Sequence, residues 1–308
     1  MGYTYPQRHK EGAVTAEELQ FLLKSKKVIA RRLADLTKEK FLADYLLTGR
    51  PDATGGGVFY ETETEDIYTP EDAEAIEPGG EYPLTSLDEG VPSGARTVKW
   101  GQGTIFTDEK VTREGRQYVE KGLRRVGNTI VRKTDRAAWA VIASRVTSTH
   151  PASAGWTSAG RMMRDILTIQ NARAGQATGL ELDVAVLPGD KFANLIGILV
   201  DDKALPREEA NIVLTGSIPV NAYGLTWVTS QHITGTDPWL FDVEQLGGMA
   251  DEKLISPEFA PAGNTGIEAA TTRVSQGEKD GSLVRARRVT VAIVSEPMAG
   301  VRIMGTGL

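Results

Sequence analysis

The chain has 308 residues, with 35 lysines and arginines against 41 aspartates and glutamates, which gives a formal net charge of −6. This balance argues against a general nucleic-acid binder, because such domains carry a basic excess that displaces counterions from phosphates. Hydrophobic residues make up 40% and charged residues 25%, which is typical of a globular protein with a large core. Cysteine is absent, which excludes disulfides, thiolate metal ligands and cysteine nucleophiles.

No apolar run approaches the roughly 20 residues of a membrane span. The first residues also lack the apolar centre of a signal peptide. We therefore expect synthesis in the cytoplasm, with no membrane partner.

Charge is segregated along the chain. Residues 1–50 carry a net charge of +4, residues 55–97 carry −10 and residues 108–148 carry +5. An acidic block of this kind is typical of a solvated or disordered tail. Here it lies between two basic stretches with helical periodicity, so its position calls for another explanation.

The first basic stretch, 15–47, is predicted to be a helix. Thr15 and Glu18 form a capping box, apolar side chains recur at helical spacing, and Gly49 follows the end. Unbroken, this helix would extend roughly 50 Å and project beyond a compact domain. The alternative is an ordinary packed amphipathic helix, interrupted near 25–27.

The acidic segment 55–97 is predicted to form an extended two-stranded loop that is stabilised by another surface, because it is too poor in apolar residues to build a core. On a strand, Glu61, Glu63 and Glu65 would share one face at spacings of about 6.6 Å. Such a row could hold a cation or a catalytic carboxylate pair. No neighbouring residue supplies a partner, so a solvated or salt-bridging face is the simpler interpretation.

After a strand-like stretch at 99–106, a second long helix is predicted from 107 to 149. Gly115, Gly122 and Gly127 lie inside it and each costs about 1 kcal/mol relative to alanine. Tertiary packing must therefore hold this helix together, and a kink or break near Gly115 is expected. Its basic side consists of Arg116, Lys121, Arg124, Arg125, Arg132, Lys133 and Arg136. Such a side could bind nucleic acid, but the surrounding acidity favours a solvated or protein-binding face.

From 157 onward the pattern is that of a mixed α/β structure. One helix is predicted to open at Ser158 and to run to 169, and another is predicted over 191–199 with Asp190 as its cap. The predicted strands are 182–187, 212–214, 225–229, 239–241, 267–274, 283–294 and 301–304, with 267–294 as a hairpin.

Motifs for catalysis are missing. There is no P-loop, and the GxGxxG pattern begun by Gly101 and Gly103 fails at Phe106. The three histidines are isolated from one another, with no HExxH spacing, and no GxSxG elbow occurs. The sequence therefore predicts no catalytic residue, no metal ligand and no cofactor.

Several stretches occur in an order found in one family. They are 55–61, 76–83, 98–101, 106–109 and 128–133, after a long N-terminal helix. In this order they resemble the major capsid proteins of tailed phages with the Hong Kong 97-like fold, and most closely the versions found in phages of actinobacteria. The resemblance covers most of the chain and is strongest between 55 and 145.

The resemblance implies an α+β fold divided into an N-terminal arm (1–54), an extended loop (55–104), a peripheral domain with a spine helix (105–150 and 267–308) and an axial domain (151–266). It implies a structural protein rather than an enzyme. Copies of the chain would assemble as pentamers and hexamers into an icosahedral head that encloses double-stranded DNA. The implied location is the virion, with assembly in the host bacterial cytoplasm.

The same resemblance implies the partners. Besides other copies of the chain, these are a portal protein at one vertex and packaged DNA in weak, non-specific contact. A separate scaffolding protein is also expected, because only the arm precedes the loop and leaves no room for a fused scaffolding segment. Two alternatives remain open, namely an encapsulin-like nanocompartment shell of the same fold and an α/β hydrolytic enzyme.

Combined with the charge map, the resemblance predicts contacts between subunits. The acidic loop of one subunit is expected to dock on the basic spine helix or arm of the next. The expected contact residues are Glu61, Glu63, Glu65, Asp66, Arg124, Arg125 and Arg132. Residues 55–97 contain no lysine, so the loop-lysine cross-link of the family's best-known member is not expected, and Lys99 at the loop base is the nearest candidate.

Overall fold

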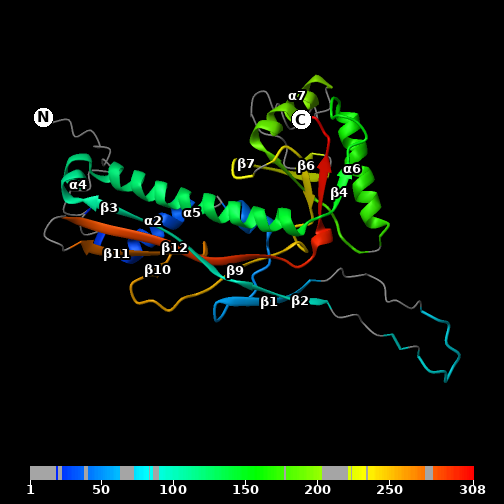
Figure 1. Cartoon of the computed structure of the whole chain (residues 1–308), viewed down its shortest axis with the longest axis horizontal. Coiled ribbons are helices and arrows are strands. Elements are labelled where there is room, and N and C mark those ends of the chain that lie inside the picture. The colour runs from blue at the N-terminus through cyan, green and yellow to red at the C-terminus, as the bar shows by residue number, and fades with distance from the viewer. Residues whose placement is uncertain are drawn as a thin grey trace, which may run out of the picture.

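The computed structural model describes residues 19, 23–37, 41–62, 73–82, 84–85, 90–176, 178–202, 221–222, 224–233, 235–274 and 280–308. It shows two β-sheets joined by one long helix, with a narrow two-stranded ribbon that projects from the body (Figure 1).

The helices are α2 (Lys26–Thr37), α3 (Leu42–Leu46), α4 (Asp108–Glu114), α5 (Arg116–Arg145), α6 (Ala159–Ala174), α7 (Gly189–Asp201) and the short 3-10 helix η1 (Pro297–Ala299). The strands are β1 (Gly57–Thr62), β2 (Val91–Arg96), β3 (Val98–Thr107), β4 (Thr149–Pro151), β5 (Val184–Pro188), β6 (Asn221–Ala222), β7 (Leu225–Ser230), β8 (Trp239–Phe241), β9 (Gly247–Asp251), β10 (Ala260–Pro261), β11 (Ile267–Val274), β12 (Gly281–Val294) and β13 (Gly300–Met304).

The first sheet has the order β10-β11-β12-β3, with β9 also paired to β12, and all its pairs are antiparallel. Helices α2 and α5 lie against it, α2 on β11 and α5 on β12 and β3 (Figure 1). The predicted hairpin of 267–274 and 283–294 is confirmed. The sheet also contains residues 98–104, which we had placed in the extended loop, and residues 247–251, which we had placed in the axial domain. Both segments belong to the sheet because their backbones pair with β12.

Helix α5 is the predicted second long helix, and the break expected at Gly115 is confirmed. Gly115 separates α4 from α5 with φ 63° and ψ −146°, a conformation that L side chains rarely adopt. Inside α5, a Cβ at Gly122 would lie 2.4 Å from the Phe106 ring, and one at Gly127 would lie 2.6 Å from Thr37. These glycines allow β3 and α2 to approach the helix closely, so packing offsets their low helix propensity.

The single helix predicted over 15–47 is wrong within the described residues. The chain leaves the helical conformation at Ser25 and again at Phe41, which separates α2 from α3. The alternative of an interrupted, packed helix is the correct one, because α2 lies on β11 and α5 rather than projecting outward. The turn at Phe41 places this ring 4.6 Å from the buried guanidinium of Arg288.

The second sheet has the order β4-β13-β8-β5-β7-β6. Helices α6 and α7 share an apolar core with β5 and β13. Ser158 caps α6 as predicted, since its hydroxyl accepts a hydrogen bond from the Arg161 amide at 3.4 Å. The cap predicted at Asp190 is wrong, because α7 already begins at Gly189 and places Asp190 in its first turn, where a carboxylate favours the helix dipole.

The remaining predicted strands are found close to their expected bounds, β5 starting two residues late at Val184. The strand predicted at 212–214 lies outside the described residues. Among the helices that the structure describes, none is long and apolar enough to cross a membrane.

The two sheets meet around the C-terminal half of α5. Trp139 on α5 contacts Trp239 and Phe241 on β8 edge to face, with ring centroids 5.5 and 6.1 Å apart. The same core contains Leu42 and Leu46 of α3. Helix α5 therefore belongs to both halves of the body and fixes their relative position.

Candidate subunit interface

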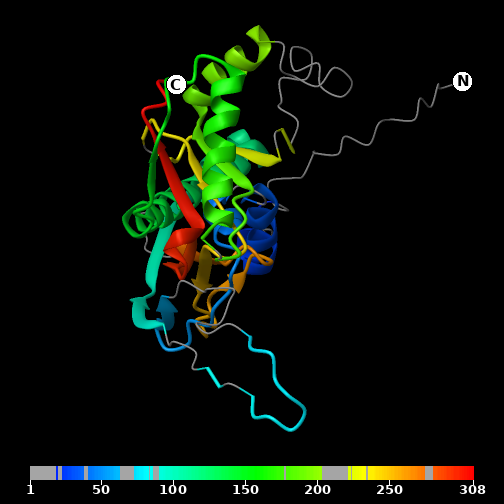
Figure 2. The same cartoon turned by 90° about the vertical axis from the view of Figure 1, so that its right-hand side faces the viewer.

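The predicted two-stranded loop is confirmed as the antiparallel pair β1 and β2, in which Gly57 lies opposite Arg96 and Thr62 lies opposite Val91. The ribbon extends away from both sheets (Figures 1 and 2). Among its described residues, the root of the ribbon has a core, formed by Val58 with Ala53, Ala250 and Ile293. A two-stranded ribbon is only marginally stable by itself in water, so the part beyond the root needs a further surface.

Glycines at the root of the ribbon allow the chain before it, at Gly49, to pack directly on the backbone of β9. The Gly49 amide donates to the Gly247 carbonyl at 3.0 Å, and the Met249 amide donates to the Gly49 carbonyl at 2.9 Å. A Cβ on Gly248 would lie 2.6 Å from the Gly49 carbonyl oxygen. The arm thus adds itself to the free edge of β9, and this pairing sets the direction in which the ribbon leaves the body.

One predicted acidic contact residue can be placed on the ribbon. Glu61 lies on β1, is exposed, and is on the same face as Phe59. The other three, Glu63, Glu65 and Asp66, lie outside the described residues. Of the row of glutamates predicted for this strand, the structure therefore describes only Glu61.

The predicted basic contact residues lie together. Arg124, Arg125 and Arg132 are all exposed on α5. Their positions along the helix place them on one side of it, within about 100° of arc at 3.6 residues per turn. Within the described part of the chain, none of the three forms an ion pair with a carboxylate of the same subunit, so no such pair neutralises their charge.

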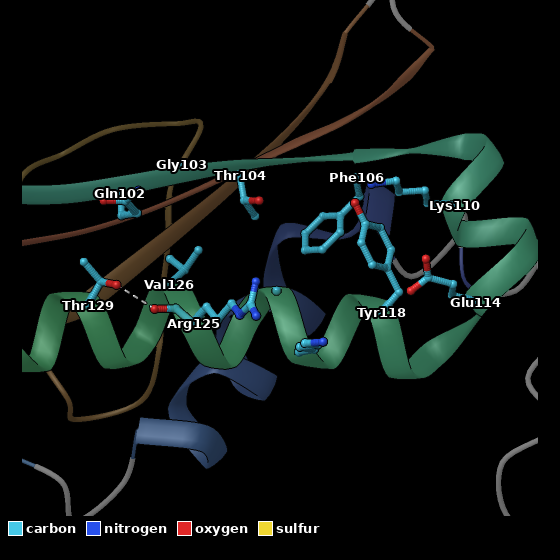
Figure 3. Close-up of a pocket in the computed structure, with 12 residues that line it drawn as sticks. Gln102, Gly103, Thr104, Phe106, Lys110, Glu114, Tyr118, Arg125, Val126 and Thr129 are labelled. Atoms are coloured by element: carbon cyan, nitrogen blue, oxygen red, sulfur yellow. Dashed lines mark hydrogen bonds between the residues drawn. The ribbon is translucent and has the colours of Figure 1, made fainter.

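A groove runs along this helix between α5 and β3. One end is a cavity of about 440 Å³ lined by Lys110, Lys121 and Arg125 opposite the single carboxylate of Glu114. In Figure 3, Arg125 points into the space between helix and strand, while Phe106 and Tyr118 close the end near α4. The rings of Phe106 and Tyr118 meet edge to face at 5.6 Å.

The groove continues toward the C-terminal half of α5. A second cavity of about 320 Å³ shares Gln102 and Thr129 with the first and is lined by Arg132, Lys133 and Arg136. The Lys133 ammonium lies 5.4 Å from the centre of the Trp100 ring. The sequence predicted that the cations of α5 share one side of the helix. It did not predict that Lys110 of α4 joins them or that β3 forms the opposite wall of the groove.

Sequence reasoning missed a buried pair that joins the two halves. His232, treated as isolated, has its Nδ1 2.8 Å from a carboxylate oxygen of Asp135 on α5. The other oxygen of Asp135 accepts the Ala43 amide of α3 at 3.1 Å. Burial raises the pKa of Asp135, and the hydrogen bonds from His232 and Ala43 oppose this rise. The available signal was an aspartate inside the apolar stripe of the helix.

A second missed group is Arg288 on β12. Its guanidinium donates to both carboxylate oxygens of Asp44 at 2.7 and 2.8 Å and to both of Asp251 at 2.8 and 2.9 Å. Its side chain is 1% exposed. The pKa of Arg288 is raised, because the two carboxylates outweigh the opposing effect of burial.

Both groups join separate parts of the fold. Of the other two histidines, His150 is half-buried on β4, and His9 lies outside the described residues. Among the residues that the structure describes, no group of three or more histidine, aspartate or glutamate side chains could hold a metal ion.

Comparison with known proteins places this architecture in a family. The model of a family described as phage capsid protein matches residues 90–303. No curated protein matches the sequence. Among solved structures, the chain is similar to the capsid of cyanophage P-SCSP1u, with 10% identity and a TM-score of 0.57 over 84% of this chain and 86% of the other.

Two further similarities point the same way. A virus-like particle from Pyrococcus furiosus shares 9% identity, with a TM-score of 0.56 over 89% of this chain and 97% of the other. A structure of Mycobacterium phage Che8 shares 14% identity, with a TM-score of 0.51 over 90% and 92%. At these identities the likeness shows the fold, and the predicted α+β capsid fold is confirmed.

Proposed function

This chain belongs to the phage capsid protein family, and we propose that its copies assemble as pentamers and hexamers into an icosahedral head that encloses double-stranded DNA. The chain is a structural protein of the virion shell rather than an enzyme, so the hydrolytic alternative is wrong. The family match over 90–303 carries the proposal. The exposed ribbon supports it, because a segment without a core of its own suits a protein that completes its packing against neighbours.

In this shell the acidic loop of one subunit docks on the spine helix α5 of the next. The proposed contacts join Glu61, Glu63, Glu65 and Asp66 to Arg124, Arg125 and Arg132. Two observations support this docking: the three arginines are exposed and share one side of α5, and the adjoining groove adds further cations. Each exposed pair contributes only about 0–1 kcal/mol, but the contact repeats in every subunit and sets register as well as energy.

The expected division into arm (1–54), loop (55–104), peripheral domain (105–150 and 267–308) and axial domain (151–266) is part of this proposal, with the ribbon itself confined to 57–96. The other proposed partners are those that the family resemblance implies. They are a separate scaffolding protein, a portal protein at one vertex, and packaged DNA held by weak, non-specific contact, with assembly in the host bacterial cytoplasm.

Expression with and without charge reversal tests the proposal. The purified native chain should form shells of icosahedral outline in negative-stain electron microscopy, whereas small discrete particles would contradict the shell role. Reversing Arg124, Arg125 and Arg132 to glutamate should abolish assembly or shift its salt dependence. A control with the same charge change at the exposed Arg145, Arg161 and Arg164 should assemble like the native chain. Unchanged assembly of the first variant would contradict the loop docking alone.

A nanocompartment shell is the second candidate, favoured by the similarity to the virus-like particle from Pyrococcus furiosus. The contents of purified particles separate the two functions. A phage head carries double-stranded DNA and is encoded beside portal and tail genes. A nanocompartment carries a cargo enzyme that is encoded nearby.

A further inference from the structure

The ribbon presents an aromatic side chain that no other side chain covers within the described part of the chain. Phe59 on β1 is 94% exposed, and it lies on Gly94 of β2, where a Cβ would be 3.5 Å from its ring. Pro92 and Gly57 occupy neighbouring positions on the same face, so no bulky side chain covers the ring. A ring that stands exposed above Gly94 forms a protruding apolar knob of the kind that anchors interfaces.

Charge alone does not explain how such a ribbon is held. One exposed ion pair changes affinity by no more than about fivefold, and salt screens it. Burial of one phenylalanine removes about 150–250 Å² from water, which is the largest single contribution that this face of the ribbon can make. The ribbon therefore needs an apolar acceptor on the neighbouring subunit.

One cavity lined by described residues combines aromatic walls with a mouth of small residues. It has a volume of about 340 Å³ and lies between the C-terminal half of α5 and the second sheet. Trp139 and Trp239 supply aromatic walls, and Ala140, Ala143 and Gly235 keep the mouth free of bulk. The apolar groove between α2 and α5 is smaller, at about 250 Å³, and its described lining contains no aromatic side chain.

The charges around knob and cavity are complementary. Phe59 is flanked on its own face by Glu61 and, diagonally across the ribbon, by Arg96. The cavity is rimmed by Arg136 and by Asp237, which accepts from Arg302 at 2.6 and 2.9 Å. A ring that enters the cavity beside the two contacting tryptophans can thus place the Glu61 carboxylate toward Arg136 and the Arg96 guanidinium toward Asp237.

We propose that Phe59 of one subunit inserts into the Trp139–Trp239 cavity of a second copy and anchors the ribbon there. This inference rests on the shell function proposed above and names the contact that holds the loop in place. The acidic part of the loop steers the ribbon toward the basic helix, and the ring provides the short-range contact.

Disulfide trapping tests the contact directly, since the native chain contains no cysteine. The variant Phe59→Cys with Ala143→Cys should give ladders of linked subunits when particles are oxidised and run on a non-reducing denaturing gel. The matched control joins Phe59→Cys to Thr129→Cys, which lies in the α5–β3 groove. Ladders from the first pair alone support the proposal. Ladders from the control pair alone, or from neither pair in assembled particles, overturn it.

A second variant leaves Phe59 in place and fills the cavity. Ala143 is exposed, so Ala143→Trp should fold, as checked by circular dichroism, yet raise the concentration needed for assembly by at least about tenfold. Ser144→Trp, at the neighbouring exposed position outside the cavity lining, should assemble normally. Normal assembly of Ala143→Trp overturns the anchor. If the native chain forms no shell, the shell function itself fails, which is a different result.

Discussion

Replacing Arg288 by methionine is expected to destabilise the folded subunit strongly. The guanidinium joins three parts of the chain, because it lies on β12 and binds Asp44 of α3 and Asp251 of β9. Phe41 covers it from one side. Methionine keeps much of the apolar volume of the arginine stem but leaves two facing carboxylates without their cation.

The size of the loss follows from the burial of the three groups. Removing one partner of a buried ion pair costs about 3–5 kcal/mol, because the remaining charge loses its compensation. Here the arginine is 1% exposed, but Asp44 and Asp251 are 21% and 25% exposed, so water can solvate them in part. We therefore expect the lower end of the range, about 3 kcal/mol.

Urea unfolding of unassembled subunits, followed by tryptophan fluorescence, measures this loss. A second variant that combines Arg288→Met with Asp44→Asn and Asp251→Asn removes all three charges. It should recover more than half of the loss, because a fully neutral replacement avoids the uncompensated carboxylates. The reasoning is refuted if the single variant unfolds within about 1 kcal/mol of the native chain, or if the triple variant is the less stable of the two.

Three further predictions concern the body of the subunit. The raised folded-state pKa of Asp135 means that the folded chain takes up this proton before the unfolded chain does, so its contribution to stability grows as pH falls through that pKa. Unfolding at pH 7 and near the ordinary aspartate pKa of about 3.9 should thus show the native chain gaining on Asp135→Asn at the lower pH, and a constant difference would contradict this. Gly122→Ala should cost about 1–3 kcal/mol because its Cβ meets the Phe106 ring, whereas Gly197→Ala, at an open helix position, should gain about 0.5–1 kcal/mol in the same urea assay. Gly248→Val should detach the arm from β9 and expose the ribbon root to limited proteolysis, and an unchanged cleavage pattern would exclude a role of this crossing.

Local sequence patterns predicted those structural features that are determined by residues close together in the sequence. The break at Gly115, the cap at Ser158 and the β11–β12 hairpin each depend on a few neighbouring residues, and each is confirmed. The helix over 15–47 failed because the chain is extended at Phe41, whose ring packs on Arg288, a residue far away in the sequence. Helical periodicity continues across such a turn and cannot reveal it.

The candidate interface likewise has features that local sequence patterns predicted and features that depend on tertiary structure. The basic side of α5 follows from helical spacing, and the structure brings Arg124, Arg125 and Arg132 together as expected. The groove itself requires knowing that β3 lies beside α5, which is a tertiary fact. Likewise, nothing near His232 in the sequence points to Asp135, because the two residues meet only where the sheets join.

The overall charge of −6 is the sum of oppositely charged segments, and we assign different roles in assembly to their long-range attraction and to the short-range apolar contact of Phe59. In the proposed docking, opposite net charges on the loop and the spine helix attract at distances where apolar contacts contribute nothing, so they should act mainly on the rate of encounter. In the proposed anchor, the exposed Phe59 acts only on contact, so it should set how long two subunits remain together. Raising the salt concentration should therefore slow shell assembly, followed by light scattering, more than it loosens finished shells. Phe59→Ala should show the opposite balance, and equal effects of both treatments on the two stages would contradict this assignment of roles.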